Sequence, residues 1–481
     1  MTRAAVVLLL AGLALRIVLA AWLPLGTDET YAIAVAREFS WSFFDHPPIG
    51  FWLPVVMAKL TGIEAAFIYR LPFLMCGTVT AFCIWRIGQT LGGARVGFLS
   101  LLLFTLAPHM LIGGGVFVVP DGPLNMFLAL TALALIAALG NNKMRNWVTV
   151  GVWLALAMAC KYQAGLFPVS VLAFLLFTRG QWRRLLGAGP WIAAAIGLAG
   201  LIPVVVWNMQ NDWASFAFHT GRVGPSFQPA NFAQMVLGQA IYLIPTTFVF
   251  GCLALWQATR RQADMNTRLL AWLAIGPIGM FMVTYIYGTS TFPHWTMPGW
   301  LFAIPLAALW LNDRASPWPM RSFVGFAAAI WALLLVIIVH VPTGILTRTA
   351  EVLPDWDDTT EIFDYSALEK TATDAGWLTD GTLVVALDWI EAGHLSTGLG
   401  GRYDIRVIGD APHHFQFMDA AQRTDNAVLL VPGRGKRYAK DLADAPQIAA
   451  QAGARFAPLG EITLDRAGRP YMNVTAFRVI W

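Results

Sequence analysis

The sequence contains little charge. Asp, Glu, Lys and Arg make up 12% of its 481 residues, whereas a soluble domain carries about 25%. Hydrophobic residues account for 57% of the chain, and the mean hydropathy is +0.60. An ordinary soluble protein is therefore excluded. The composition predicts a polytopic α-helical membrane protein whose surroundings are a lipid bilayer.

Neither cysteine chemistry nor nucleotide binding finds support in the sequence. The four cysteines lie in apolar runs, without the spacing of a disulfide framework or a zinc site, and are interpreted as structural thiols. No Gly-rich phosphate loop precedes a predicted helix. A nucleotide-binding fold is therefore not supported.

Charge is also unevenly distributed along the chain. Basic residues outnumber acidic ones over 1–342, and acidic residues outnumber basic ones over 343–481. The sequence pI of about 8.9 therefore does not indicate a nucleic-acid partner. Two parts with opposite charge balance predict two domains, a transmembrane domain over 1–342 and a soluble domain over 343–481.

A membrane-spanning helix needs about 20 mostly apolar residues. The sequence predicts eleven such spans, at about 4–22, 68–90, 96–117, 122–140, 147–160, 163–178, 188–207, 232–257, 269–288, 297–311 and 322–341. The fifth and sixth are short and are divided only by Lys161, Tyr162 and Gln163. They are therefore interpreted as re-entrant or broken helices.

The short loops between these spans alternate in their content of basic residues. The more basic set is predicted to be cytoplasmic, which places the N-terminus inside. After an odd number of spans, the C-terminal domain lies outside. Two short segments near 30–41 and 49–62 contain many aromatic residues. They are predicted to lie along the outer interface of the membrane.

The C-terminal part is predicted to be an α/β domain. Apolar, β-branched runs indicate strands at 382–387, 405–408, 427–431 and 474–480, and helical patterns fit between them near 389–397 and 438–452.

Acidic residues follow the first span directly. Asp28 and Glu29 come after Gly26 and Thr27, at the start of a predicted helix. Such a pair is often only a helix cap, because an acid is favoured at a helix N-terminus. Carboxylates beside the hydrocarbon region cost desolvation free energy unless they are hydrated, so their presence there favours a functional role. We therefore interpret the pair as functional, with Asp28 as a general base.

Two further acidic positions lie on the outer side. Asp45 and His46 precede two prolines, which favours either a turn or an active-site wall. Asp and His are also ligands for divalent metals. Asp121 opens the fourth span and is either the N-cap of that helix or a second acid that faces the first.

Candidate phosphate-binding groups lie on the same side. Lys161, beside Tyr162, either extends toward the membrane surface or binds a lipid phosphate. Arg222 ends an aromatic loop over 207–222 that either forms an interfacial belt or binds a phosphate and a sugar. His294 is a proton carrier, a metal ligand or a hydrogen-bonded structural residue.

One arginine is predicted inside a span. Arg16 lies in the middle of the first apolar segment. An intramembrane arginine is costly and is usually paired, so either an outer-loop acid or a lipid phosphate is expected beside it.

These motifs together resemble a known family. An outer-loop Asp-Glu pair, then Phe-Asp-His-Pro-Pro, then Pro-Asp-Gly-Pro at the start of a later span are similar to the bacterial GT-C glycosyltransferases. The nearest branch contains the lipid A aminoarabinose transferases and the dolichyl-phosphate-mannose protein mannosyltransferases. The resemblance covers residues 1–342.

The resemblance implies an inverting transfer of sugar from a polyprenyl phosphate, usually undecaprenyl phosphate in bacteria. Asp28 matches the acid of the family's first outer loop. Glu29 and Asp121 would shape the acceptor pocket, and Lys161 and Arg222 would stabilise the leaving phosphate. Some members bind a divalent cation. The candidate ligands for such a cation are His46 and His294. Together with Tyr162 and Asp45, these two histidines complete the predicted substrate-binding set.

The resemblance also implies a location and an acceptor. The enzyme would lie in the bacterial inner membrane, with its active site and C-terminal domain on the periplasmic side. The acceptor would be lipid A, lipopolysaccharide or another glycan, or else a protein. The alternative from another class is a transporter or flippase, which would also contain intramembrane charges and broken helices.

Overall fold

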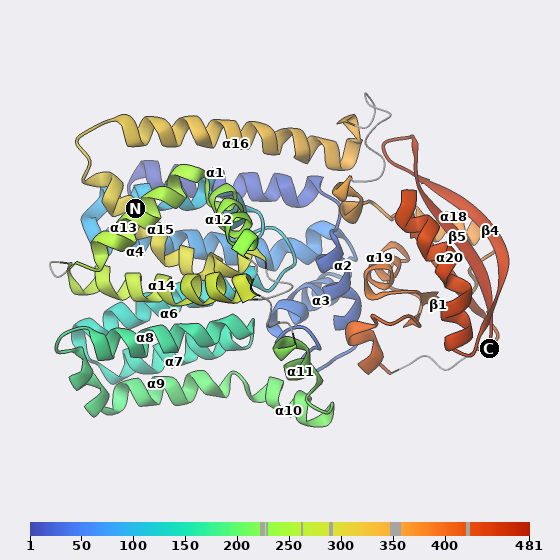
Figure 1. Ribbon diagram of the computed structural model, residues 1–481, viewed down its shortest axis with the longest axis horizontal. Helices are drawn as coiled ribbons and strands as arrows, with labels where there is room; N and C mark the ends of the chain where they lie inside the picture. The colour runs from blue at the N-terminus through green and yellow to red at the C-terminus, as the bar shows by residue number, and fades with distance from the viewer. Residues whose placement is uncertain (222–226, 228, 261–262, 288–291, 347–356, 420–423) are drawn as a thin grey trace. The chain divides into compact units, whose positions relative to one another are not determined.

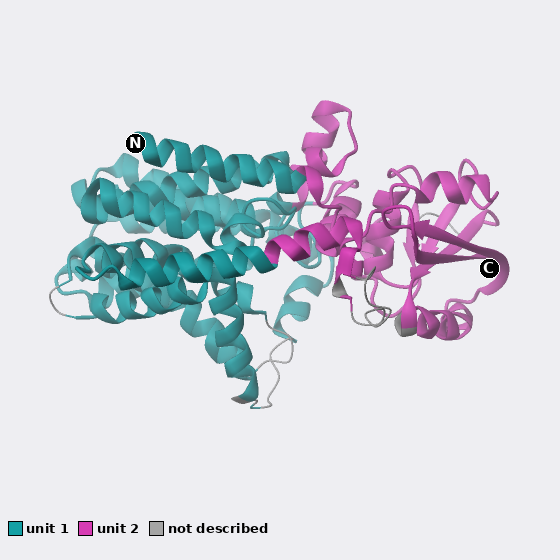
Figure 2. Cartoon of the chain, turned by 90° about the horizontal axis from the view of Figure 1, so that it is seen from above, with its two compact units in different colours: residues 1–20, 41–50, 70–333 teal, residues 21–40, 51–69, 334–481 magenta. Residues whose placement is uncertain are grey.

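The computed structural model describes residues 1–481 except 222–226, 228, 261–262, 288–291, 347–356 and 420–423 (Figure 1). The chain divides into two compact units (Figure 2). The helical unit comprises residues 1–20, 41–50 and 70–333, and the mixed unit comprises 21–40, 51–69 and 334–481. Each unit thus combines segments that are far apart in the sequence.

The helical unit is built from apolar helices and short 3-10 turns. They are α1 (Arg3–Trp22), α4 (Ala66–Leu106), α5 (Pro108–Leu111), α6 (Asp121–Asn141), α7 (Met144–Met158), η1 (Tyr162–Gly165), α8 (Leu166–Phe177), η2 (Gln181–Leu186), α9 (Ala188–Ala199), α10 (Ile202–Gln210), α11 (Ala214–Thr220), α12 (Pro229–Leu243), α13 (Pro245–Ala258), α14 (Met265–Tyr287), η3 (Pro293–Thr296), α15 (Met297–Asn312) and α16 (Trp318–Thr343). The helices α1, α4 and α16 each extend into the mixed unit.

Several of these helices are long and apolar enough to cross a membrane. Within the described residues there are five, α1, α4, α6, α14 and α16, or up to seven if two bent helix pairs are each one span. The pair α9 and α10 is bent by 40°, and the pair α12 and α13 by 106°. Many apolar helices are confirmed, while the number of eleven spans stays a prediction.

Besides the bent pair α9 and α10, two predicted spans differ from the helices that form. The segment predicted at 96–117 is helical only to Leu106, because Pro108 starts the separate short helix α5 and residues 112–115 form turns. The segment predicted at 232–257 breaks at Ile244, where Pro245 begins α13. The break predicted at Lys161 is confirmed, since α7 ends at Met158 and η1 begins at Tyr162.

Glycines let some helices of this unit approach closely. A Cβ atom on Gly200, just after α9, would lie 2.0 Å from the backbone oxygen of Ala155 on α7. On Gly189 it would lie 2.4 Å from the indole of Trp147. The α7–α9 contact therefore depends on glycine at these positions.

The mixed unit contains a five-stranded sheet and the helices around it. Its elements are α2 (Thr27–Ala36), α3 (Ile49–Thr61), η4 (Asp358–Ile362), α18 (Leu368–Asp374), β1 (Leu383–Ala386), α19 (Trp389–Gly398), β2 (Ile405–Val407), η5 (His413–Phe417), β3 (Ala427–Gly433), α20 (Gly435–Gln451), β4 (Arg455–Asp465) and β5 (Pro470–Ile480). The strand order is β2-β1-β3-β5-β4. The strand β1 is parallel to β2 and β3, whereas β5 is antiparallel to β3 and β4.

The α/β pattern predicted for the end of the chain is observed, with one strand missed. The four predicted strands correspond to β1, β2, β3 and β5, and the two predicted helices to α19 and α20. The sequence reading missed β4, which contains Pro458 and Gly460 at a register shift against β5. An edge strand needs fewer apolar residues, so its pattern is weak.

We predict that Gly200→Ala destabilises the protein by about 1–3 kcal/mol, because the new methyl group would overlap the Ala155 carbonyl. Thermal unfolding of the detergent-purified protein measures the effect. The matched control is Gly279→Ala, since a Cβ on this α14 glycine would meet no atom within 4 Å. Equal unfolding midpoints for the two variants would contradict the packing argument.

Candidate functional site

A buried ion pair lies at the centre of the helical unit's polar residues. The Lys161 ammonium donates to Asp121 Oδ2 over 2.7 Å, and the two residues are only 5% and 4% exposed. Asp121 is the first residue of α6, whose N-cap is Pro120. The N-cap alternative for Asp121 is therefore wrong, because its carboxylate contacts Lys161 instead. Lys161 lies in extended backbone at the break before η1.

Two histidines stack beside this pair. The rings of His109 and His294 are 5.9 Å apart and nearly parallel, and Tyr242 stacks on His109 at 5.4 Å. Burial, followed by the charge of Lys161, lowers the pKa of His294 to about 3. The imidazole is therefore neutral near pH 7 and can accept or donate one hydrogen bond at each nitrogen as its tautomer dictates.

Buried polar atoms without partners surround the same place. Asp121 Oδ1, Asn125 Oδ1 and His109 Nε2 have no hydrogen-bond partner among the described residues. Asp121 and Asn125 are one turn apart on α6, so their side chains share a face. Because an unsatisfied buried acceptor costs about 1–3 kcal/mol, these atoms are suited to a ligand that carries hydroxyl groups.

The sequence reading did not select His109 or Asn125. His109 follows Pro108 in a run that reads as a continuous apolar span, and Asn125 lies inside another one. Both are polar residues within predicted membrane helices. Their position inside apolar segments is the sequence feature that could identify them, because polar residues there usually face the interior of the helix bundle and mark a functional site.

The Asp45–His46 segment lies in the helical unit near the same charges. It forms a turn in which Phe43 N donates to the carbonyl of His46, and a ring nitrogen of His219 lies 2.8 Å from the Asp45 carbonyl. Burial lowers the pKa of His46 to about 3, and the charge of Lys161 adds to this effect. The segment is therefore a turn that also carries titratable groups close to Lys161.

Tyr162 contacts other residues of the predicted outer loop. Its hydroxyl lies 2.7 Å from Ser215 Oγ, and its ring meets the edge of His219 at 4.8 Å. Arg222, the other predicted phosphate ligand, lies outside the described residues.

The two acids after the first span belong to the mixed unit. Gly26 is the N-cap of α2, and the Glu29 carboxylate accepts the Gly26 N–H over 3.0 Å. Glu29 is buried, whereas Asp28 is exposed. Glu29 therefore has a structural role at the helix start, and Asp28 is the more accessible carboxylate. The catalytic roles of Asp28 and Glu29 stay predictions.

Arg16 is fully buried on α1 of the helical unit. Its Nε would lie 2.5 Å and 3.0 Å from Cβ atoms placed on Gly115 and Gly77, so these glycines make room for the side chain. Its three guanidinium nitrogens have no hydrogen-bond partner among the described residues. Of the two partners left open by the sequence, an outer-loop acid is not found among the described residues, and a lipid phosphate stays a prediction.

A divalent metal finds no complete ligand set in the described part of the chain. That part contains no group of three or more His, Cys, Asp or Glu side chains arranged to hold a metal ion. His46 and His294, the candidate ligands, are accordingly not members of such a group.

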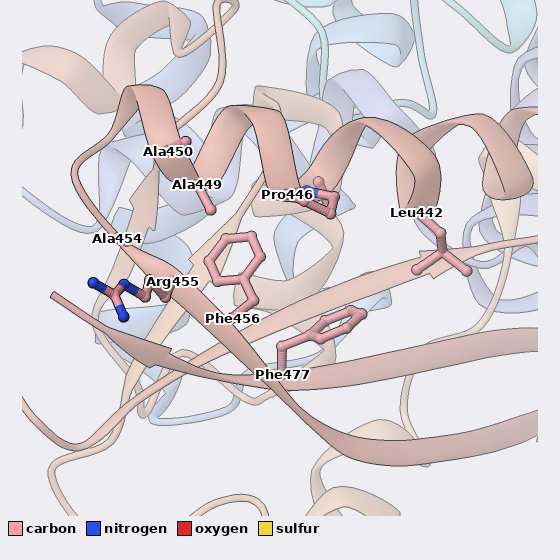
Figure 3. A pocket seen from close by; sticks show the side chains of 9 residues that line it. Leu442, Pro446, Ala449, Ala450, Ala454, Arg455, Phe456 and Phe477 are labelled. Carbon is pink, nitrogen blue, oxygen red and sulfur yellow. The ribbon is translucent and has the colours of Figure 1, made fainter.

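A cavity of about 290 Å³ lies in the mixed unit, between α20 and the strands β4 and β5 (Figure 3). Its walls include Leu442, Phe456 and Phe477, and among the described residues Arg455 is the one titratable side chain that lines it. None of the predicted site residues lines it, so it does not supply the expected chemistry.

The family model for dolichyl-phosphate-mannose-protein mannosyltransferases matches residues 45–207. This range includes Asp45, His46, Asp121, Lys161 and Tyr162. No curated protein sequence matches the chain.

Solved structures resemble nearly the whole chain. ArnT from Cupriavidus metallidurans bound to undecaprenyl phosphate aligns with a TM-score of 0.64 and 17% identity, over 99% of this chain and 98% of that one. The apo state of the same protein aligns with a TM-score of 0.66 and 16% identity, over 98% of this chain and 97% of that one. An Archaeoglobus fulgidus oligosaccharyltransferase in complex with Zn and sulfate aligns with a TM-score of 0.50 and 11% identity, over 92% of this chain and 69% of that one.

We predict that Lys161→Met destabilises the protein by about 3–5 kcal/mol, because it leaves the Asp121 carboxylate buried without a counter-charge. The double variant Lys161→Met/Asp121→Asn should recover most of this loss. Denaturant unfolding of the purified protein measures both. Lys143→Met, at an exposed lysine, is the control with little effect. Additive losses in the double variant would refute the pairing.

The lowered pKa of His46 predicts a pH dependence of stability. The folded pKa of about 3 lies below the unfolded value of 6.5. Between about pH 3 and pH 6.5, His46 is protonated in the unfolded chain but neutral in the native state. Stability that is complete above about pH 6.5 therefore falls toward pH 3, by at most about 1.4 kcal/mol per pH unit for this residue.

His46→Gln should flatten this part of the curve. Unfolding midpoints of both proteins, recorded from about pH 7 down to pH 4, test this expectation. If the wild-type and variant curves stay parallel over that range, His46 does not contribute.

Proposed function

We propose that this chain, a glycosyltransferase of the GT-C fold in a multi-pass membrane protein, transfers a sugar from a polyprenyl phosphate to an acceptor outside the bacterial inner membrane. The acceptor hydroxyl or amine attacks the anomeric carbon and inverts it. The bond from that carbon to the phosphate oxygen breaks, and polyprenyl phosphate leaves with the electron pair.

The buried Asp121–Lys161 pair is the observation that carries this proposal. Burying a salt bridge this completely costs about as much free energy as the ion pair returns. A contribution to stability is therefore a poor explanation for its presence. The pair lies within the stretch that matches the mannosyltransferase model, beside acceptor atoms for which the described part of the chain supplies no partner. A lipid-linked sugar supplies both complements, a phosphate for the cation and hydroxyl groups for the acceptors.

Each charged residue then has a distinct role. Asp28 takes the proton from the attacking group. Lys161 has three N–H donors, of which Asp121 holds one, and the others face the phosphate as its charge grows in the transition state. Asp121, Asn125 and His109 accept hydroxyl hydrogens of the sugar. Glu29 holds the start of the helix that presents Asp28.

In the same proposal, Arg222 binds the phosphate and Tyr162 forms part of the wall that faces the lipid. Three further residues form the wall around Lys161. His46 and His294 do so as neutral imidazoles, and Asp45 does so through its backbone contact with His219.

A periplasmic glycolipid such as lipid A, or another glycan, is the acceptor we favour. The ArnT structures align over almost the full length of this chain, including its C-terminal part. The second candidate is a protein acceptor, because the matching family model describes protein mannosyltransferases. The likeness to glycosyltransferases favours both over a transporter.

We predict that Asp28→Asn lowers the rate of sugar transfer by about 10²–10⁴-fold, the usual contribution of general base catalysis. The measurement uses the full chain reconstituted with polyprenyl-phosphate sugars and either a lipid A or a peptide acceptor. Asp313→Asn, at an exposed acid, is the matched control and should keep the wild-type rate.

Three outcomes are decisive in this experiment. Transfer to only one acceptor class selects between glycolipid and protein. Transfer by Asp28→Asn at the wild-type rate rejects Asp28 as the base. No transfer by the folded wild type with any donor rejects the proposed function.

A further inference from the structure

The helix that carries Asp28 packs against the C-terminal part of the chain. Both α2 and α19 belong to the mixed unit and lie against each other. Every residue of α2 from Glu29 to Ala36 is buried. Asp28, by contrast, is exposed. The helix is therefore held along nearly its whole length while one carboxylate stays accessible.

The closest approach of these two helices is at Gly393 of α19. A Cβ atom at this position would lie 2.8 Å from the Tyr31 backbone nitrogen and 3.0 Å from its Cα atom. Real Cβ atoms do not come this close to a backbone, so any side chain at Gly393 would displace α2. Because Tyr31 is only three residues from Asp28, such a displacement would move the carboxylate as well.

The next residue of α19 contacts the first turn of α2. A ring nitrogen of His394 lies 3.3 Å from Thr27 Oγ1, directly beside Asp28 in the sequence. The ring of Tyr365 stacks on His394 at 4.9 Å and fixes its plane. Thr27 and Tyr31 are one turn apart and share the face of α2 that meets α19.

Tyr31 anchors the same face from its other end. Its hydroxyl accepts the backbone N–H of His414 over 3.1 Å. Its ring packs edge-on against Trp389 at 5.0 Å and Phe51 at 5.9 Å. Aromatic pairs of this kind are rigid and strongly packed. The orientation of α2 is thus fixed by residues from the last quarter of the chain.

We propose that the C-terminal α/β part positions Asp28, and that Gly393 and His394 are its positioning residues. The inference rests on the proposed role of Asp28 as the base. It assigns the C-terminal part a function in the reaction itself, because a displacement of about 1 Å at a reacting group can cost about 10²-fold in rate.

The test compares Gly393→Ala with Gly433→Ala in the full chain. Gly433 ends β3 and is equally crowded, since a Cβ there would be 2.8 Å from the Tyr438 ring. Its neighbour lies on α20 rather than on α2. Gly393→Ala should lower kcat by about 10-fold or more with little change in the donor KM, whereas Gly433→Ala should keep the wild-type kcat.

A double-variant cycle with Asp28→Glu separates positioning from general damage. If Gly393 acts through Asp28, the longer carboxylate partly offsets the displacement, and the loss in Gly393→Ala/Asp28→Glu is smaller than the product of the two single losses. Multiplicative losses, or equal kcat values for Gly393→Ala and Gly433→Ala, would overturn the proposal.

A His394→Phe variant tests the second contact. It keeps the stacking on Tyr365 but removes the hydrogen bond to Thr27, and His394→Gln restores a donor and an acceptor. The kcat should fall in the first variant and recover in the second. An equal kcat for both would exclude a positioning role for His394.

Hydrogen exchange keeps the inference testable without activity. Backbone amides of residues 27–36 should exchange faster in Gly393→Ala than in the wild type, and at the wild-type rate in Gly433→Ala. If the wild type transfers no sugar at all, the proposed function fails, and this exchange measurement still decides whether α19 holds α2. Unchanged exchange in Gly393→Ala would refute the contact.

Discussion

The cost of burying charge organises the helical unit. Asp121 and Lys161 come from different parts of the chain and are almost completely buried, which is tolerable only because their side chains meet. This pair fixes the start of α6 against the break after α7. The stacked histidines, the turn at His46 and the acceptor atoms that have no partner among the described residues lie around it.

A second constraint is the close approach of helices, and it acts in both units. In the helical unit, glycines let α7 and α9 meet and make room for the buried Arg16. In the mixed unit, one glycine lets α19 lie directly on α2. Small residues at such crossings are typical of packed membrane helices. At Gly393 a glycine likewise lets the C-terminal α/β part contact the segment that follows α1.

Local pattern predicted much of the fold and of the site. Apolar runs located the helices, and β-branched runs located four of the five strands, because both signals depend on neighbours in the sequence. The motif around Asp28, Asp45 and Asp121 led to the correct fold class. The pattern could not find His109 and Asn125, whose importance depends on what lies across the unit. It also extended one helix beyond Leu106, where proline and glycines end it.

The sequence by itself determined that the chain is rich in apolar helices, because composition is sufficient for that conclusion, and the order of its acidic motifs resembles that of the GT-C glycosyltransferases. Only the tertiary structure decided which charges meet. Asp121 was open between a helix cap and a site acid, and its partner lies 40 residues away in Lys161. Only the tertiary structure likewise shows what holds α2, because its Tyr31 contacts His414, which is 383 residues away in the sequence. No local pattern encodes such distant contacts, because they arise when separate segments pack into one unit.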